Sequence, residues 1–289
     1  MRKAFLIGFQ YSQLNNHNKK LPGIIIDLYK VYCFLISKGW KEDEIIIFSD
    51  IVKDDSTNIL RNAILEKIVD SDILTFIEDC KERKQYILFT SHNHYNNFSS
   101  IFKFEKSISS MESNDIKHYF VYYTGHCKDG NLILPNNTLL SLELFRDYIS
   151  PIGTEKVICI MDCCEGGIEL PFVLHNKVYR CKQNLKKEDF IRNEMVCISS
   201  SLENEKSITS QSGSFFTRNL LEILDSSQSL SNILEKVRKS NQITQINKEI
   251  KQTATISVSL PHISYLFGFL YSFPTFSIYL HNSHLLIEY

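Results

Sequence analysis

Two short motifs in the sequence combine reactive side chains with glycine, and each of them follows an apolar run. The run 119–123 leads into Thr124-Gly125-His126, and the run 157–161 leads into Asp162-Cys163-Cys164-Glu165-Gly166-Gly167. Both runs are short and rich in β-branched, aromatic or sulfur side chains, so each predicts a buried strand. In an open α/β sheet, chemistry takes place at the carboxyl ends of the strands, where glycine lets backbone N–H groups approach a substrate. The two motifs therefore predict a cysteine and a histidine that act together as nucleophile and base.

Each motif also has a simpler structural interpretation. Free cysteine is among the most buried residue types, and a histidine at the end of a strand is often only a core or turn residue. The matched form of the two motifs favours the functional interpretation. Cys163 competes with Cys164 for the role of nucleophile, and because side chains alternate along a strand, only one of the two thiols can face His126.

The elements around these motifs alternate between strands and helices. The apolar run 4–9 predicts a central strand, and apolar residues at spacings of three and four predict an amphipathic helix over 24–36 that ends at Lys38-Gly39. A second strand over 44–48 and a second helix over 57–69 follow. This alternation implies a parallel sheet, so the predicted fold class is α/β, with a mostly parallel central β-sheet flanked by helices.

The same patterns predict the elements of the rest of the chain. Helices are expected near 72–82 and over 142–148, 213–224 and 230–239, and strands over 86–89, 119–123, 156–161 and 195–199. The segment 91–113 contains His92 and His94, but it is rich in Asn and Ser and lacks nearby Cys or Asp ligands, so it predicts a solvated loop and no metal site. The segment 171–193 is expected to be irregular, and its basic side chains indicate a solvated loop or, alternatively, a cleavable linker.

Composition limits the classes of partner. The chain has 289 residues, enough for one large domain, and 32 Lys and Arg against 33 Asp and Glu give a net charge of −1. This balance gives no reason to expect nucleic acid or an anionic membrane as a partner. Eight cysteines without a recognisable signal peptide indicate reduced thiols in a cytoplasmic or, alternatively, nuclear protein. The segment 252–280 carries no formal charge, but polar residues interrupt it, so terminal strands or a packed tail are favoured over a membrane span.

The motifs resemble those of the metacaspases, a group of caspase-like cysteine peptidases. Tyr123-Thr124-Gly125-His126 is similar to the group's Tyr-Ser-Gly-His, and Asp162-Cys163-Cys164-Glu165-Gly166-Gly167 is similar to its Asp-Ser-Cys-His-Ser-Gly. The segments 3–8, 21–27, 198–201, 213–217 and 252–254 follow the order of the same group, with Ile24 and Ile26 departing from its Leu-x-Gly-Cys-x-Asn-Asp motif. The resemblance implies a three-layer caspase-like fold over residues 1–270, in which 1–170 resemble the large subunit, 171–194 form a basic loop and 195–270 resemble the small subunit. An aromatic tail over 271–289 follows.

The resemblance implies a catalytic dyad of His126 and Cys164, because the Asp-x-Cys register selects Cys164 over Cys163 as the nucleophile. It further implies that the backbone amides of Cys164 and of Gly125 or Cys127 hold the oxyanion. Cys127 stands where the group usually has glycine. If this position needs a positive φ, a cysteine would strain it and weaken the oxyanion site.

The resemblance also implies a class of substrate. In metacaspases, the residues at the positions of Asp27, Thr124 and Asp162 contact a basic P1 side chain, the one immediately before the scissile bond. Two carboxylates and a hydroxyl favour Arg or Lys through charge-assisted hydrogen bonds and repel Asp. Protein or peptide substrates with Arg or Lys at P1 are therefore expected. The structural alternatives are an exposed helix acid for Asp27 and a cap for Asp162.

Metacaspases commonly need calcium, which several carboxylates hold. Glu169-Leu170-Pro171-Phe172 is similar to the group's Asp-Leu-Pro-aromatic segment, but 139–142 reads Leu-Leu-Ser-Leu where a pair of acids is expected. One carboxylate cannot supply the roughly six to eight oxygens of a calcium site, so no metal or other cofactor is expected. The resemblance also implies a monomer and an autoprocessing loop, whose candidate cleavage sites are Lys177, Arg180, Lys182, Lys186, Lys187 and Arg192.

Two other functions stay open from the sequence. A pseudoenzyme would keep the fold and work as a binding or regulatory protein, which Cys127 and the altered glycine motif would fit. A legumain-like peptidase would cleave after Asn, because Cys164-Glu165-x-Gly167 is also similar to the Cys-Glu-Ser-Gly of that family. Hydrolysis of peptides that end in Arg, Lys, Asp or Asn separates the three functions.

Overall fold

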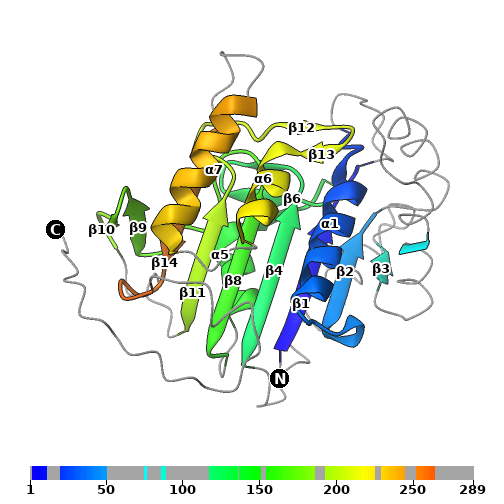
Figure 1. Ribbon diagram of the computed structural model, residues 1–289, viewed down its shortest axis with the longest axis horizontal. Helices are drawn as coiled ribbons and strands as arrows, with labels where there is room; N and C mark the ends of the chain where they lie inside the picture. Colours follow the sequence, from blue (N-terminus) through cyan, green and yellow to red (C-terminus); the bar gives the residue numbers. More distant parts are fainter. Residues whose placement is uncertain are drawn as a thin grey trace.

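The computed structural model describes residues 2–11, 20–50, 75–76, 86–88, 117–135, 137–150, 154–185, 193–224, 229–244 and 252–263. These residues form a nine-stranded sheet in the order β10-β9-β14-β11-β8-β4-β1-β2-β3 (Figure 1). Its strands are β1 (Arg2–Gly8), β2 (Ile45–Ser49), β3 (Tyr86–Leu88), β4 (His118–Thr124), β8 (Lys156–Asp162), β9 (Phe172–His175), β10 (Val178–Cys181), β11 (Glu194–Ser199) and β14 (Thr255–Val258).

The strands from β11 to β3 are parallel, as the alternation of strands and helices predicted. β1 pairs with β4 on one side and β2 on the other, and β8 lies between β4 and β11. β14, β9 and β10 continue the sheet in antiparallel orientation. Because the parallel strands end at the same edge, the residues that follow Gly8, Thr124, Asp162 and Ser199 gather there.

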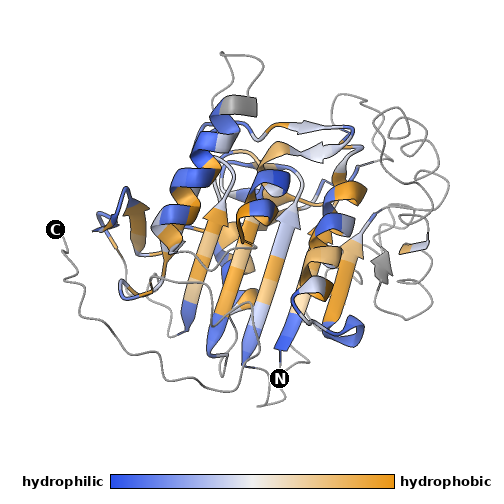
Figure 2. Ribbon diagram, in the orientation of Figure 1, coloured by the Kyte–Doolittle hydropathy of each residue, from blue (hydrophilic) through white to orange (hydrophobic). Residues whose placement is uncertain are grey.

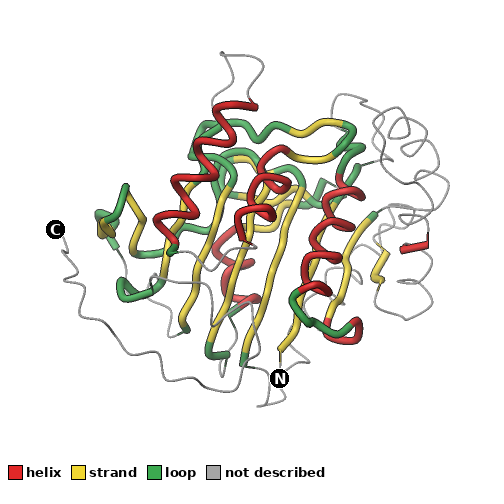
Figure 3. The backbone as a smooth tube through the Cα atoms, viewed as in Figure 1, coloured by secondary structure: helices red, strands yellow, loops and turns green. Residues whose placement is uncertain are grey.

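Helices cover both faces of the sheet and complete the three layers (Figures 1 and 3). They are α1 (Ile24–Ser37), α5 (Leu142–Ile149), α6 (Phe215–Leu224) and α7 (Leu230–Thr244), besides the short 3-10 helix η2 (Glu42–Glu44). α1, α6 and α7 pack on one face and α5 on the other. Side chains alternate along a strand, so β1 sends Leu6 into the α1 core, and Phe5 and Ile7 into the α5 core. Figure 2 shows β2, β8 and β11 as largely hydrophobic and β4 as paler, which suits parallel strands covered on both faces.

Two small sheets lie at the end toward which β4 and β8 point (Figure 1). The first contains β5 (Cys127–Lys128), β6 (Asn131–Ile133) and β7 (Leu139–Ser141), and the second contains β12 (Thr209–Ser210) and β13 (Gly213–Ser214). The sequence did not predict these strands, because two or three residues carry too little hydrophobic pattern. They bring the segments after β4 and before α6 over the carboxyl edge of the large sheet.

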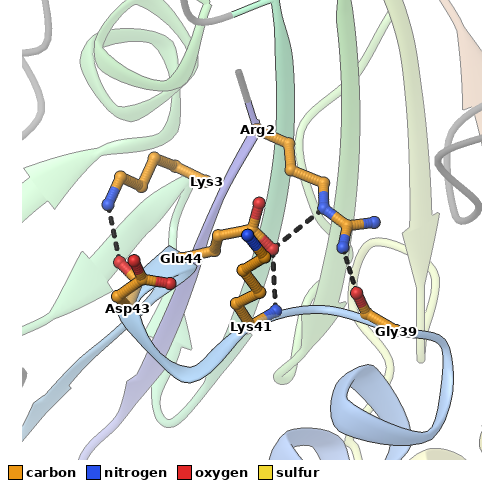
Figure 4. A network of polar contacts seen from close by, with 6 residues as sticks. All are labelled: Arg2, Lys3, Gly39, Lys41, Asp43 and Glu44. Atoms are coloured by element: carbon orange, nitrogen blue, oxygen red, sulfur yellow. Dashed lines mark hydrogen bonds and ion pairs between the residues drawn. The ribbon is translucent and has the colours of Figure 1, made fainter.

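A polar network at the opposite edge fixes the start of β1 (Figure 4). The Arg2 guanidinium donates to Glu44 Oε2 at 3.0 Å and to the carbonyl oxygen of Gly39. Lys3 Nζ donates to the carbonyl oxygen of Asp43 at 2.7 Å. These contacts tie β1 to the connection between α1 and β2, and they hold the two strands side by side.

Two predicted elements need correction. The segment 171–193 was expected to be irregular, but it contains the hairpin β9–β10, whose turn residue Asn176 has a φ of 58° that asparagine tolerates. The helix expected over 213–224 begins two residues later, because Gly213 and Ser214 form β13. Several positions named in the sequence analysis lie outside the described residues: the helix 57–69, all but residues 75–76 of the helix near 72–82, the segment 91–113 with His92 and His94, Lys186, Lys187, Arg192 and 264–289. Among the helices that are described, none has both the length and the apolar character of a membrane span.

Candidate active site

His126 and Cys164 follow neighbouring strands, β4 and β8. The strands run parallel with Thr124 paired to Asp162, and the Gly125 amide donates to the carbonyl oxygen of Asp162 at 3.4 Å. Each reactive residue lies two positions beyond this pair. The register therefore brings the histidine and the cysteine to the same point of the sheet edge.

The two adjacent thiols have different surroundings. Cys163 is 1 % exposed and lies in the α5 core with Cys127, whereas Cys164 is only partly buried. The neighbouring Cys127 thiol and burial together raise the pKa of Cys163 well above its usual range, so its sulfur stays protonated. Burial also raises the pKa of Cys164, but the Ser207 amide, which donates to the Cys164 sulfur at 3.4 Å, acts in the opposite direction. Cys164 is thus the thiol that a reactant can approach.

Cys127 lies in an ordinary strand conformation. Its φ is outside the left-handed region. It pairs with Leu132 of β6, and the neighbouring pair, His126 and Ile133, is hydrogen-bonded. Because hydrogen-bonded and non-hydrogen-bonded pairs alternate in an antiparallel ladder, the pair of Cys127 and Leu132 is of the second kind. Its N–H therefore points away from β6, and the strain considered for a cysteine at this position is absent. Gly125 is required for a different reason, since an added Cβ there would lie 2.8 Å from the Tyr123 hydroxyl and 2.9 Å from the Tyr11 hydroxyl.

Asp162, the last residue of β8, is 4 % exposed. Its Oδ1 accepts a hydrogen bond from the Ser207 hydroxyl at 2.7 Å, and its Oδ2 accepts one from the Thr217 hydroxyl at 2.6 Å. Burial raises the pKa of this carboxyl, and the surrounding hydroxyl groups partly offset the rise. Because Ser207 also donates its amide to the Cys164 sulfur, the carboxylate and the candidate nucleophile share one neighbour.

Asp27 is completely buried in the first turn of α1, so the expected alternative of an exposed helix acid is wrong. Its two carboxylate oxygens accept from the Ser214 amide at 2.9 and 3.0 Å. Gly213 beside it has a φ of 98°, and a Cβ there would lie 2.3 Å from Asp27 Oδ1. Burial, followed by the charge of Asp162, raises the pKa of Asp27 well above its usual range. Two carboxyl groups from opposite ends of the large-subunit-like region are therefore close enough to repel each other.

Thr124 completes the trio of residues that the resemblance assigned to substrate binding. It is 2 % exposed at the end of β4, where it pairs with Asp162. The adjacent Tyr122 hydroxyl shares a hydrogen bond with the Thr217 hydroxyl at 2.7 Å, and Thr217 in turn donates to Asp162. β4, β8, α1 and α6 thus meet at one buried cluster of polar side chains inside the fold.

Ser207 and Gln252 belong to the site, although the sequence analysis assigned neither of them to it. Gln252 lies in the segment 252–254 that resembles the metacaspases, whereas Ser207 lies in no matched segment. Gln252 Nε2 donates to the Ser207 hydroxyl at 3.1 Å, and Gln252 Oε1 accepts from the Ile208 amide at 3.4 Å. Gln252 is 5 % exposed, so these bonds lie away from bulk water. Gln252 fixes the loop that carries Ser207, but a serine in a polar loop has no local signal that distinguishes it.

The segment after the nucleophile is also held in place. Glu165 has a φ of 59°, its Oε2 accepts from the Asp129 amide at 2.7 Å, and its own amide donates to the carbonyl oxygen of Glu205. Beside this segment lies a cavity of about 830 Å³. The glutamates that line the cavity are Glu143, Glu165, Glu169 and Glu203. Glu169 forms an ion pair with Lys182, and within the described ranges no three His, Cys, Asp or Glu side chains come together as a metal site would need.

The basic residues of the expected processing loop do not all share one environment. Arg180 lies within β10, where it pairs with Val173, while Lys177 and Lys182 flank that strand. The hairpin places these three residues at the antiparallel edge of the sheet rather than in an extended loop.

Comparison with known proteins decides the family. A family model described as the caspase domain matches residues 1–262. The chain belongs to the caspase domain family. Caspase domains are those of cysteine-type peptidases, hydrolases that act on proteins, and the resemblance to caspase-like peptidases is thereby confirmed.

Among solved structures, the crystal structure of caspase-1 from Spodoptera frugiperda is similar to this caspase domain, with a TM-score of 0.52 and 14 % sequence identity. The match covers 89 % of this chain and 85 % of that chain, and it confirms the α/β fold expected from the sequence. No curated protein matches the chain.

Proposed function

We propose that this caspase domain is a metacaspase-like cysteine endopeptidase that cleaves after Arg or Lys through a dyad of His126 and Cys164. The observation that carries the proposal is the pair of buried carboxyl groups, Asp27 and Asp162, which accept from neutral amides and hydroxyls. Asp162 also shares Ser207 as a neighbour with the candidate nucleophile. Two such groups are costly to keep ionised in the free protein, which the raised pKa of each reflects. A substrate guanidinium or ammonium group would relieve both that cost and their mutual repulsion.

The proposed reaction uses the imidazole of His126 twice. It first accepts the proton of the Cys164 thiol as the sulfur attacks the carbonyl carbon, and it then gives that proton to the leaving amine when the C–N bond breaks. Water, deprotonated by the same imidazole, hydrolyses the thioester and restores the thiol. The amides of Cys164 and Cys127 are the better candidates for the oxyanion hole, because the Gly125 amide already donates to Asp162.

Fluorogenic peptides with Arg, Lys, Asp or Asn at P1 test the proposal. Hydrolysis of the Arg and Lys peptides alone supports it, while hydrolysis of the Asn peptide would support the legumain-like alternative. If the folded protein hydrolyses none of the four peptides, the pseudoenzyme alternative would be favoured. The φ of Cys127 lies outside the left-handed region, so one of the two features that fit an inactive site no longer supports it. The altered glycine motif is the other. Intact mass of the same samples reports autoprocessing at the proposed basic residues, because a Cys164→Ala sample should stay uncleaved.

Calcium is not expected to activate the enzyme. Glu169 lies in the segment that resembles the calcium-binding segment of metacaspases, and its carboxylate is paired with Lys182. Residues 139–142, where a pair of acids is expected, contain no acidic residue, and their only polar side chain is that of Ser141. The residues present therefore do not fit a hard-cation site, which needs roughly six to eight oxygens. Activity on Arg peptides should change by less than about twofold between chelator and millimolar calcium. A calcium-dependent rise of about tenfold or more would contradict this expectation.

The protein is expected to be a monomer. Caspases pair through the last strand of the sheet, but here β14, the last described strand, already pairs with β9 of its own chain. The outer strand β10 carries Arg180 and is flanked by Lys177 and Lys182, and such charges discourage edge-to-edge pairing. Light scattering after size exclusion should give the mass of one chain at micromolar concentration. A stable two-chain mass would contradict the expectation.

A further inference from the structure

Tyr11 lies three residues beyond the end of β1, and no step of the proposed reaction uses it. Its side chain is 1 % exposed and its φ is 57°. The left-handed region is costly for a bulky aromatic residue, and such a conformation persists only where the surroundings enforce it. Two sets of contacts surround Tyr11, one at its backbone and one at its hydroxyl.

Asp50 holds the backbone of Tyr11. It follows the last residue of β2, is 2 % exposed, and accepts the Gln10 amide with Oδ1 at 2.6 Å and the Tyr11 amide with Oδ2 at 2.7 Å. Hydrogen bonds from two consecutive amides to one carboxylate are charge-assisted and fix the direction of both peptide units. The carboxylate thereby stabilises the unusual conformation of Tyr11.

The hydroxyl of Tyr11 forms hydrogen bonds with the backbone just before β5 and at the end of β6. It accepts from the His126 amide at 2.8 Å and donates to the carbonyl oxygen of Ile133 at 2.6 Å. The Ile133 amide donates directly to the His126 carbonyl oxygen at 3.0 Å. A hydrogen-bonded pair of an antiparallel ladder normally exchanges two direct N–H···O bonds. Between His126 and Ile133 the second of these is replaced by a bridge through the Tyr11 hydroxyl. Burial raises the pKa of this hydroxyl, which keeps it protonated and able to donate.

The ring of Tyr11 also contacts the side chain of His126. The two ring centroids lie 4.6 Å apart at an interplanar angle of 34°. The Tyr123 hydroxyl donates to the His126 carbonyl oxygen at 2.8 Å, so both polar groups of the His126 backbone are engaged by tyrosine hydroxyls. Tyr11 therefore contacts the imidazole of His126 as well as its backbone.

The geometry points to Tyr11 as a positioning residue that orients the imidazole of His126 toward Cys164, with Asp50 holding Tyr11 in place. The assignment rests on the proposed function, in which His126 is the acid and base. A small misplacement of a catalytic group lowers the rate of the chemical step while it leaves substrate binding nearly unchanged. Loss of the Tyr11 hydroxyl should therefore act on kcat rather than on KM.

Tyr11→Phe keeps the ring and removes the hydroxyl. We expect kcat for Arg peptides to fall by roughly 10- to 100-fold, with KM within about twofold of the wild type. In protein with ¹³C-labelled histidine, the His126 ring signal, identified by its absence in His126→Ala, should shift or broaden. Tyr179→Phe is the matched control, because it also removes a buried hydroxyl that donates to a carbonyl oxygen, that of Ile263. The control should keep the wild-type kcat and His126 signal.

An unchanged His126 signal in folded Tyr11→Phe would overturn the inference, as would an equal loss of kcat in the Tyr179→Phe control. The signal also separates this inference from the proposed function. If the wild type has no peptidase activity but its His126 signal still changes in Tyr11→Phe, the proposed function would be contradicted and the positioning role of Tyr11 would stand. If Tyr11→Phe does not fold, Asp50→Asn tests the same arrangement through the backbone of Tyr11, and an unchanged kcat and His126 signal in that variant would overturn the inference.

Discussion

Replacing Cys164 by alanine is expected to lower peptide hydrolysis by at least about 1000-fold, because no other described thiol can take its place. Cys163 is adjacent in sequence, but its sulfur lies in the α5 core and donates to the carbonyl oxygen of Gly166 at 3.3 Å. Initial rates on an Arg peptide, measured with folded protein, check the expectation.

Cys163→Ala is the matched control for this variant. It removes a neighbouring thiol of the same chemistry and should keep kcat within about fivefold, since no step of the reaction uses that sulfur. Its cost should appear in unfolding instead, at about 1 kcal/mol or more for a small side chain removed from a packed core. If Cys163→Ala were the inactive variant and Cys164→Ala the active one, the assignment of the nucleophile would be wrong.

Asp162→Asn is expected to lower kcat/KM for Arg and Lys peptides by roughly 30- to 1000-fold, equivalent to about 2–4 kcal/mol of lost interaction with a buried cation. The asparagine keeps an oxygen that can accept from Ser207 or Thr217, so the local hydrogen bonds change less than the charge does. Because burial raises the pKa of Asp162, the wild-type activity on Arg peptides should also begin to fall at a higher pH than an ordinary carboxyl would cause. Equal activity of wild type and Asp162→Asn on Arg peptides would contradict a role in substrate binding.

Asp27→Asn tests what the second carboxyl group of the buried cluster contributes to stability and to the proposed substrate binding. The pKa of Asp27 is raised in the folded state, so between its ordinary value and the raised one the folded protein binds more protons than the unfolded chain. The free energy of unfolding of the wild type therefore falls as the pH rises through that window. The asparagine of the variant does not titrate, so the variant should not show this fall. We expect Asp27→Asn to be more stable than the wild type by about 0.5–2 kcal/mol at pH 8, with a smaller difference at low pH, and to be less active on Arg peptides.

Urea unfolding of both proteins at a series of pH values checks this prediction. Asp43→Asn is the control, because Asp43 is an exposed acid in η2, outside the buried polar cluster. It should follow the wild-type dependence on pH. A gain in stability for Asp27→Asn that is independent of pH, or a loss at pH 8, would show that the Asp27 carboxyl does not carry the cost assigned to it.

Local sequence patterns predicted much of the fold and the two reactive residues. Short apolar runs identified β1, β2, β4, β8 and β11, and spacings of three and four identified α1 and α7. These signals are local, because the hydrophobic pattern of a buried strand or an amphipathic helix lies within a short run of consecutive residues. The resemblance added Asp27, Thr124 and Asp162, which the structure brings into one buried polar cluster. The antiparallel hairpin β9–β10 was missed because its basic residues resemble those of a solvated loop.

What surrounds the reactive residues depends on contacts that no local pattern contains. Asp27 is held by the amide of Ser214, which lies 187 positions later in the chain. The preference for Cys164 over Cys163 rests on which side of β8 faces the α5 core. Only the β5–β6 pairing shows that Cys127 has no need for the conformational freedom of glycine.

The sequence by itself determined that a histidine and a cysteine follow two strands of an α/β sheet, because strand ends and glycines are local features. The tertiary structure placed those two strands side by side. It also decided how those residues are held. Ser207, Gln252, Tyr11 and Asp50 act through hydrogen bonds between segments that are far apart along the chain. Such bonds depend on the register of the strands across the whole sheet, so their partners cannot be read from the residues on either side.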